Sequence, residues 1–433
     1  MSDITALQAR RDRALGSGVS IFYRQPLHIV RGEGAYLIDA DGRRYVDMYN
    51  NVPCVGHANP RVVEAMSRAQ STLNTHSRYL HEGIVEFAER LTAMHGEQIE
   101  SVVFSCSGTE AIEVALRMAR FATGAQGIIC TNATYHGNSE LVSRLSRTDR
   151  AGQVADDIRA IPFPEMYRPL EEGLSEAELT DAYLAKLREA IEDLQAAGLG
   201  VATLIVCSIL ANEGLPDIPA SFMPRAAEMV RAAGGLVIAD EVQAGYCRTG
   251  KWWGYEVTGF TPDIVVTGKP MGNGVPLSAT AASKALVDGF RARTRHFNTF
   301  AQSPLQAAVG MAVLDEIEDR GLRQNAASVG AWLTAAMRER IGRWPSLGDV
   351  RGRGLFVGAE MVKDTVSRAP DAERAADICE RIKDKGFLTA AAGAFNNSVK
   401  IRPPLVFSQT DAEAFLGAFD QAMDEAHAAG ADG

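Results

Sequence analysis

The sequence predicts an α/β fold with a mostly parallel sheet, joined to a smaller α+β domain. Between residues 61 and 305, short apolar runs alternate with helical patterns, which is typical of a parallel sheet covered by helices. Beyond residue 305, strand-like segments lie between helices without that regular alternation. At 433 residues the chain is too long for one compact core, so we expect two or more domains.

The composition excludes several classes of protein. A net charge of −10 argues against nucleic acid or an anionic membrane as the main partner. The sequence has no run of 18 apolar residues, and its N-terminus is polar, so we expect neither a membrane span nor a signal peptide. The six cysteines are scattered, without C-x-x-C pairs or metal-like clusters. They predict reduced thiols in a cytoplasmic enzyme, and no zinc site.

Residues 1–60 are expected to contribute to the small domain. A helix is predicted within residues 1–20, and Tyr49–Pro60 is typical of a loop. Turn signals at Gly32–Gly34 and Asp41–Gly42 separate three short runs that predict an antiparallel meander. These runs are Leu27–Val30, Ala35–Ile38 and Arg44–Asp47.

Residues 61–305 are expected to form the large domain, and residues 306–433 the C-terminal small domain. Glu110–Ala122 is the clearest helix, and Gln302–Ile317 predicts a long helix leading away from the sheet. Residues 151–176 are predicted to be irregular. In the small domain, Gly348–Glu360 and Val399–Phe407 are strand-like. The strand candidates of the large domain are Ser101–Phe104, Gly127–Cys130, Thr203–Cys207, Leu236–Ala239, Ile264–Thr267 and Ser278–Ala282.

Two of these strands are followed by residues of distinctive chemistry. Leu236–Ala239 leads to Asp240, and Ile264–Thr267 leads to Lys269. The carboxyl ends of parallel strands are where α/β proteins gather ligands and catalysts. A lysine and a carboxylate there suit pyridoxal phosphate, because the lysine forms a Schiff base and the carboxylate pairs with the ring nitrogen. Taken singly, a surface lysine and a helix-capping aspartate are equally good interpretations; together they favour the cofactor.

Three further motifs each allow a functional and a structural interpretation. Ser107, Gly108 and Thr109 begin a helix and form either a phosphate cradle or an ordinary N-cap before Glu110, the commoner case. In the loop after Cys130, an aromatic ring at Tyr135 can stack on a pyridine ring beside His136, although such a pair is usually structural. Thr299 is either a phosphate donor or part of a turn.

The order of these motifs resembles the class III aminotransferases of pyridoxal-phosphate fold type I. SGTEA, YHG, ADEVQAGYCRTG, DIVVTGKPMGNG and FNTF follow one another as in that family, and the resemblance runs from about Pro26 to about Ser408. It implies a seven-stranded sheet in the large domain. It also implies that Lys269 is the Schiff-base lysine and Asp240 the partner of the ring nitrogen. Val242 would pack against the ring opposite Tyr135, and Gln243 would bind the phenolic oxygen.

The same resemblance implies an assembly and a branch of the family. Gly108 and Thr109 would hold the phosphate, and Thr299 would reach the phosphate of the neighbouring subunit, which implies a homodimer or a dimer of dimers. The branch that it resembles contains alanine–glyoxylate-aminotransferase-like proteins and phospho-lyases. The stretches that carry this are Asn50–Val63, Leu73–Leu91, FNTFAQSP and GDVRGRGLFVG. In it, the expected substrate-binding residues are Asn51, Arg78, Lys400 and Arg402.

Two positions depart from the family pattern. Many members have a glutamate in an EPxxG context where this chain has Cys207, which either lines the pocket or is a buried small hydrophobe. Many also have an arginine three residues before the late Pro-Pro, where this chain has Lys400. Lysine offers charge without the bidentate fork of arginine, which argues against α-ketoglutarate and glutamate as the amino-group partner. Lys400 and Arg402 are equally well explained as an exposed strand pair.

Three functions are therefore compared. The first is an aminotransferase that moves an amino group from a primary amine or amino acid to a small keto acid such as pyruvate or glyoxylate. The second is a phospho-lyase or ammonia-lyase acting on a phosphorylated or phosphonate-bearing amine. The third, a cofactor-binding protein without turnover, is disfavoured because both Lys269 and Asp240 are retained.

Overall fold

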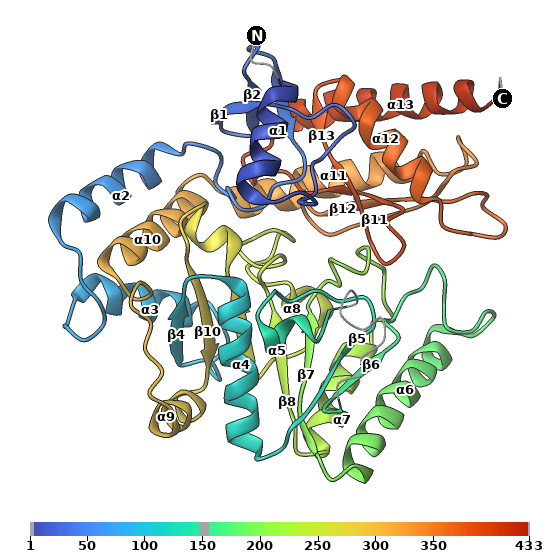
Figure 1. Ribbon diagram of the computed structural model, residues 1–433. Helices are drawn as coiled ribbons and strands as arrows, with labels where there is room; N and C mark the ends of the chain where they lie inside the picture. Colours follow the sequence, from blue (N-terminus) through green and yellow to red (C-terminus); the bar gives the residue numbers. More distant parts are fainter. Residues whose placement is uncertain (1–3, 147–155, 432–433) are drawn as a thin grey trace.

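A seven-stranded sheet lies at the centre of the large domain (Figure 1). The computed structural model describes residues 4–146 and 156–431. Within them the strand order is β4-β10-β9-β8-β7-β5-β6, and all neighbours are parallel except β10, which is antiparallel to β4 and β9. This confirms the predicted mostly parallel sheet. The strands are β4 (Ser101–Ser105), β5 (Gly127–Thr131), β6 (Ile158–Ile161), β7 (Val201–Cys207), β8 (Leu236–Asp240), β9 (Ile264–Thr267) and β10 (Ser278–Ala282).

Helices cover both faces of this sheet. Because side chains alternate along a strand, successive residues enter different cores. Ile128 and Ile205 join a cluster with α4 and α9, whereas Ile129 and Leu204 join a larger cluster that includes α6 and α7. The helices are α4 (Gly108–Thr123), α6 (Glu176–Ala196), α7 (Phe222–Ala232) and α9 (Lys284–Arg293), with the short α5 (Glu140–Ser143) and α8 (Tyr255–Thr258) between them.

Strand β6 corrects the prediction that residues 151–176 are irregular. Ile158–Ile161 pairs in parallel with β5, from Ile128↔Ile158 to Thr131↔Ile161. Only Ile158 and Ile161 of these four residues are buried, so this edge strand has too short an apolar pattern to be recognised in the sequence. Residues 151–155 lie outside the described part of the chain.

The N-terminal meander shares a sheet with the C-terminal third of the chain. After α1 (Ile4–Leu15) come β1 (Ile29–Glu33), β2 (Tyr36–Asp39) and β3 (Arg44–Asp47), which pair in antiparallel order as predicted. Strand β13 (Phe387–Leu388) then adds to β3 in parallel, with Val46 opposite Phe387.

A second four-stranded sheet, of order β11-β12-β15-β14, completes the C-terminal part. The predicted strand Val399–Phe407 ends at Ile401, because Arg402 is followed by two prolines, which cannot donate to a strand ladder. The strands are β11 (Leu347–Gly352), β12 (Val357–Met361), β14 (Ala390–Ala392) and β15 (Ser398–Ile401), and the helices are α11 (Leu322–Arg338), α12 (Ala372–Asp384) and α13 (Gln409–Ala431).

Three further helices, α2 (Pro60–Thr72), α3 (Glu82–Ala93) and α10 (Pro304–Asp319), pack together beside β4 and β10 (Figure 1). Helix α10 begins at a capping box formed by Ser303 and Gln306, which satisfies its first amides. Its Gly310 lies against the ring of Phe87, where a Cβ would come within 2.2 Å of that ring. No helix in the described residues is long and apolar enough to cross a membrane.

Candidate active site

The predicted site residues meet at the carboxyl edge of the large sheet. Asp240 at the end of β8 pairs with Cys207 at the end of β7 on one side and with Val266 near the end of β9 on the other. A pocket of about 370 Å³ opens there. The predicted residues that line it are Ser107, Gly108, Thr109, Tyr135, His136, Val242 and Lys269.

Asp240 is fixed on both of its carboxylate oxygens. Oδ2 lies 2.6 Å from Nδ1 of His136, and Oδ1 accepts a hydrogen bond from the amide of Val242 at 3.0 Å. Nε2 of His136 in turn lies 2.8 Å from the hydroxyl of Thr134. Because all of these groups are buried, the carboxylate is held by a preformed hydrogen-bond network.

Lys269 begins the 3₁₀ turn η2 (Lys269–Gly272), directly after Gly268. Its φ of 25° is uncommon for a residue with a side chain, and such strain concentrates at functional sites. Burial lowers the pKa of the Lys269 amine, with the Asp240 carboxylate opposing that shift. The lysine is therefore part of the pocket and not an ordinary surface residue.

The first turn of α4 forms another wall of the pocket. Ser107 is an N-cap, as its hydroxyl accepts from the amide of Glu110 at 3.3 Å. A Cβ on Gly108 would come within 3.1 Å of Val242, so glycine permits close approach of the backbone. Thr109 accepts at its hydroxyl from the amides of Asn138 (2.9 Å) and Ser139 (3.1 Å), in the loop that carries Tyr135. The helix N-terminus thus faces the pocket with amides that suit an anion.

Two cations lie beside the pocket, and the structure excludes an exposed strand pair. Lys400 and Arg402 are 5% and 6% exposed, and both hydrogen-bond to Oε1 of Gln243. Nζ of Lys400 also donates to Ala211 O at 3.0 Å, and Nε of Arg402 donates to Tyr49 O at 2.9 Å. Burial and the charge of Arg402 lower the pKa of Lys400 well below its usual range.

Asn51 and Cys207 are close to these groups but deeply buried. Nδ2 of Asn51 donates to the carbonyl of Gln243 at 3.4 Å, and its Oδ1 has no partner among the described residues. Cys207 is 2% exposed and does not line the pocket. Burial raises the pKa of its thiol, which therefore stays protonated as a small hydrophobic group.

Thr299 and Arg78 are not brought to Lys269 within one chain. Thr299 lines a neighbouring hollow with Phe300 and His76, which shares Cys106, Val275 and Pro276 with the pocket. Arg78 is exposed, and its guanidinium lies 4.2 Å from the centre of the Phe297 ring.

The sequence did not single out Glu213, Asn212 or a role for Glu241. Glu241 accepts from Ser208 and from the amides of Gly254 and Tyr255, so it holds that loop, and burial raises its pKa to about 7. Glu213 is 4% exposed, bonds Thr131, and has one oxygen without a partner in the described residues. The loop of Asn212 and Glu213 has no sequence motif that would have identified these two residues.

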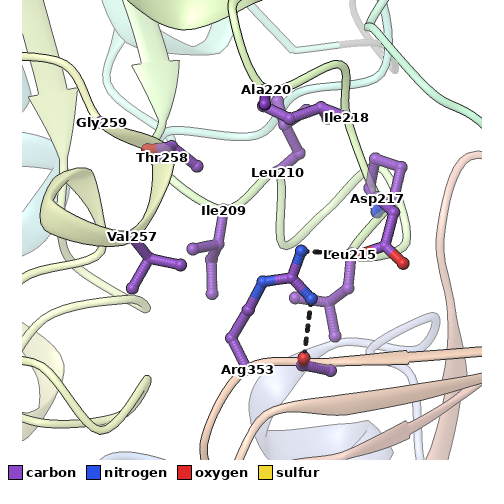
Figure 2. A pocket seen from close by; sticks show the side chains of 12 residues that line it. Ile209, Leu210, Leu215, Asp217, Ile218, Ala220, Val257, Thr258, Gly259 and Arg353 are labelled. Atoms are coloured by element: carbon purple, nitrogen blue, oxygen red, sulfur yellow. Dashed lines mark hydrogen bonds and ion pairs between the residues drawn. The ribbon is translucent and has the colours of Figure 1, made fainter. Parts of the chain in front are cut away.

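The loop after β7 lines a second pocket (Figure 2). Its walls include Ile209, Leu215 and Val257, and at its edge Arg353 forms an ion pair with Asp217 at 2.8 Å. None of the predicted site residues lines it. The candidate active site is therefore the Lys269 pocket.

Three features of the site occur together: a lysine after β9, a carboxylate held by His136 at the end of the neighbouring β8, and a helix N-terminus that lines the lysine's pocket. This combination defines a pyridoxal-phosphate-dependent enzyme of fold type I. The comparisons with known proteins agree. The family model described as aminotransferase class-III matches residues 22–423, and the chain belongs to this family.

Similar proteins cover nearly the whole chain. An alanine–glyoxylate aminotransferase 2-like protein of Drosophila melanogaster is 36% identical over 95% of this chain and 86% of its own length. An ethanolamine-phosphate phospho-lyase homologue of Caenorhabditis elegans is 33% identical over 96% of this chain and 92% of its own. Among solved structures, a phospholyase from Arthrobacter in complex with phosphoethanolamine has a TM-score of 0.93 at 38% identity, covering 96% of this chain and 99% of that one.

Proposed function

We propose that the protein is an aminotransferase that moves an amino group from a primary amine or amino acid to a small keto acid such as pyruvate or glyoxylate. The observation that carries this is the Lys269 amine, whose pKa is lowered by burial and which shares a pocket with His136, the side chain that holds the Asp240 carboxylate. Membership of the class-III aminotransferases supports it.

The residues present fit pyridoxal phosphate, and we propose the following roles. The amides of Gly108 and Thr109, with Ser107, hold the phosphate at the N-terminus of α4. Asp240, oriented by His136, faces the ring nitrogen. Tyr135 and Val242 cover the two faces of the ring, and one N–H of Gln243 binds its phenolic oxygen. Lys269 binds the aldehyde carbon.

Bound pyridoxal phosphate supplies an electron sink for the electron pair released at the substrate Cα. Asp240 keeps a proton on the ring nitrogen, because its own oxygens are fixed by His136 and Val242. Once the substrate amine has taken its place on the aldehyde carbon, Nζ of Lys269 would be neutral in a larger fraction because burial lowers its pKa, and would take the proton from Cα. The same amine then returns the proton, either to the cofactor carbon in a transaminase or toward the leaving group in a lyase.

Lys400 and Arg402 support a substrate that carries a negative charge. Both are buried, and their hydrogen-bond partners are neutral oxygens of Ala211, Gln243 and Tyr49. The buried guanidinium of Arg402, without a bonded carboxylate, gains from an anionic ligand, and such a ligand would also favour the charged form of Lys400. Asn51, whose buried Oδ1 has no partner among the described residues, is proposed to bind the substrate. Arg78 is proposed to bind the substrate of the partner subunit.

The second candidate is a phospho-lyase acting on a phosphorylated amine. Two observations favour it: the unpaired cations at Lys400 and Arg402, and the likeness to the Arthrobacter phospholyase bound to phosphoethanolamine. The residues proposed to hold the cofactor are common to both reactions, so these residues do not choose between them.

We further propose a homodimer in which Thr299 reaches the phosphate of the neighbouring site. Support comes from the hollow lined by Thr299, which is continuous with the Lys269 pocket, and from exposed aromatic side chains around it, among them Tyr79, Phe297 and Phe300. A cytoplasmic location is proposed because the six cysteines form no disulfide. We also propose that the boundaries between the N-terminal segment, the large domain and the C-terminal small domain lie at residues 60 and 305.

One experiment tests the proposed function. The purified enzyme is given alanine, 4-aminobutyrate, a diamine or ethanolamine phosphate without any acceptor, and the cofactor absorbance, keto product and inorganic phosphate are followed. Stoichiometric conversion of the cofactor to its amine form, reversed by pyruvate or glyoxylate, is the expected result. Release of phosphate with unlimited turnover and no acceptor would replace it by the lyase. Absence of cofactor absorbance would refute both.

A further inference from the structure

Asn212 links two walls of the active site. It lies in the loop after β7 and is half-buried. Its Nδ2 donates to the carbonyl of Tyr135 at 3.0 Å, and its Oδ1 accepts from Nε2 of Gln243 at 3.1 Å. The side chain therefore ties the loop of the proposed stacking residue to the proposed partner of the phenolic oxygen.

The direction of each hydrogen bond in this chain is set by Arg402. The guanidinium of Arg402 can only donate, so it requires the oxygen of the Gln243 amide. Its nitrogen then faces Asn212 and requires an acceptor there. Oδ1 of Asn212 supplies that acceptor, which leaves Nδ2 to donate to the Tyr135 carbonyl.

Only a neutral amide satisfies both ends of this chain. An aspartate at position 212 would still accept from Gln243, but it would set an oxygen against the carbonyl oxygen of Tyr135. It would also add a negative charge two hydrogen bonds away from Lys400 and Arg402. In a site of low dielectric constant, a carboxylate at that distance would compete with a substrate anion for the two cations.

The other charged groups near Lys400 and Arg402 do not compete with a substrate anion in this way. Lys400 faces Arg402, Lys269, Glu213 and the Cys207 thiol, and Arg402 also faces Asp47, whose carboxylate lies 2.8 Å from Nε2 of His57. The Glu213 carboxyl is bonded to Thr131, and burial raises its pKa, which reduces its charge. The position closest along the bonded chain is therefore Asn212.

We propose that Asn212 is a positioning residue: its amide orients Gln243, and its lack of charge leaves Lys400 and Arg402 available to an anionic group on the substrate amine. This rests on the proposed function and deepens it: the preferred substrates are amines that also carry a carboxylate or a phosphate. The test distinguishes the carboxylate from the phosphate, because each of its two substrate pairs carries one of these groups.

The test compares two matched pairs of amines, 4-aminobutyrate with butylamine and ethanolamine phosphate with ethanolamine. Anion preference is the ratio of kcat/KM within a pair. In Asn212→Asp, we expect the preference to fall by about tenfold or more, through KM of the anionic member. In Asn212→Ala, which adds no charge, we expect kcat to fall by the same factor for all four amines and the preference to stay within about twofold.

A second readout does not depend on turnover. Calorimetric titration of the holoenzyme with inorganic phosphate should show weaker binding in Asn212→Asp, by about tenfold, and no such change in Asn212→Ala. Asn396→Asp, which places the same charge in an exposed turn, is the matched control and should behave as wild type.

Three outcomes would overturn the proposal: equal effects of Asn212→Asp on both members of a pair, an unchanged preference in that variant, or a collapsed preference in Asn212→Ala. If Asn212→Asp does not fold, as judged by cofactor content and thermal midpoint, the Ala variant still tests the positioning role, because an unchanged kcat in it would overturn that role. A wild-type enzyme that turns over none of the amines refutes the proposed function instead, and the phosphate titration then tests Asn212 alone.

Discussion

The Nδ1 atom of His136 lies 2.6 Å from Oδ2 of Asp240, and both side chains are buried. The imidazole is held from behind by the hydroxyl of Thr134, 2.8 Å from Nε2. Asp240 therefore cannot rotate freely, and its remaining lone pairs have a fixed direction. This geometry suits a carboxylate whose task is to keep a proton on a neighbouring ring nitrogen.

Replacing Asp240 by asparagine should separate cofactor binding from catalysis. Asp240→Asn keeps the shape of the side chain but removes the charge, so we expect the cofactor to be retained and kcat to fall by roughly 10²-fold or more. Asp263→Asn is the control, since Asp263 precedes β9 at the opposite edge of the sheet and bonds Arg231. Cofactor content and kcat are measured for both. Unimpaired kcat in Asp240→Asn would contradict the role proposed for Asp240.

Removing the Lys269 amine should abolish turnover. Lys269→Ala loses both the covalent attachment of the cofactor and the base, so kcat should fall by at least roughly 10³-fold. The absorbance of the bound cofactor should change in the same variant. Lys186→Ala, which removes a surface lysine paired with Glu189, should keep both properties. Near-normal turnover without Lys269 would end the proposed mechanism.

Acid should unfold the protein partly through Glu360. Burial would raise the pKa of this carboxyl, but Arg351 and Arg168 outweigh it and lower the pKa to about 2. Between about pH 4.5 and 2 the unfolded chain binds the proton more readily, so the stabilisation, about 3 kcal/mol, is present above that window and lost as pH falls through it.

The measurement is the free energy of unfolding of wild type and Glu360→Gln at several pH values. The variant should lose about 3–5 kcal/mol at pH 7, because two guanidinium groups lose their partner, and its stability should depend less on pH below 4.5. Glu64→Gln, at an exposed helical position, is the control. An equally steep acid dependence in Glu360→Gln would contradict the assignment.

The contact between α3 and α10 should not tolerate a methyl group. A Cβ at Gly310 would lie 2.2 Å from the ring of Phe87, which stacks on Phe104. Gly310→Ala should therefore destabilise the protein by about 1–3 kcal/mol. Gly289→Ala in α9 has open space around the added atom and should stabilise by about 0.5–1 kcal/mol. Thermal midpoints decide; partial rescue of Gly310→Ala by Phe87→Leu would confirm the contact.

Dimerisation should depend on the surface around Thr299. Phe300 lines the same hollow and is 74% exposed, and Leu80, which follows the Tyr79 that stacks on His76 of that hollow, is 102% exposed. Leu80→Asp combined with Phe300→Asp should yield monomers that bind cofactor weakly, because Thr299 can no longer reach the neighbouring phosphate. Val366→Asp changes a side chain that is 91% exposed in another loop and is the control. Sedimentation velocity distinguishes the species.

The fold was largely predictable because the β8 and β9 strands are continuous apolar runs ending in polar residues. Such runs identify buried parallel strands without any partner information. β6 was missed because only its first and last residues are buried. The pairing of β3 with β13 was not predictable either, since nothing local in a two-residue strand specifies a partner so far along the chain.

The site was predictable where chemistry follows a strand or begins a helix. Lys269 and Ser107–Thr109 line one pocket with His136, which contacts Asp240, because the sheet topology brings those ends together. Burial was not predictable for Lys400, which an alternating strand pattern allowed to face solvent. Asn212 lies in a loop after β7, and its importance comes only from contacts with Tyr135 and Gln243, which no sequence period encodes.

The pairing of β3 with β13 has a consequence for biosynthesis. About 340 residues separate Asp47 from Phe387, so at ordinary rates of translation the N-terminal meander waits roughly 20–70 s for its last strand. All strands of the large sheet leave the ribosome within that interval. A nascent chain arrested before residue 387 should thus have a formed central sheet and an N-terminus that proteases still cut.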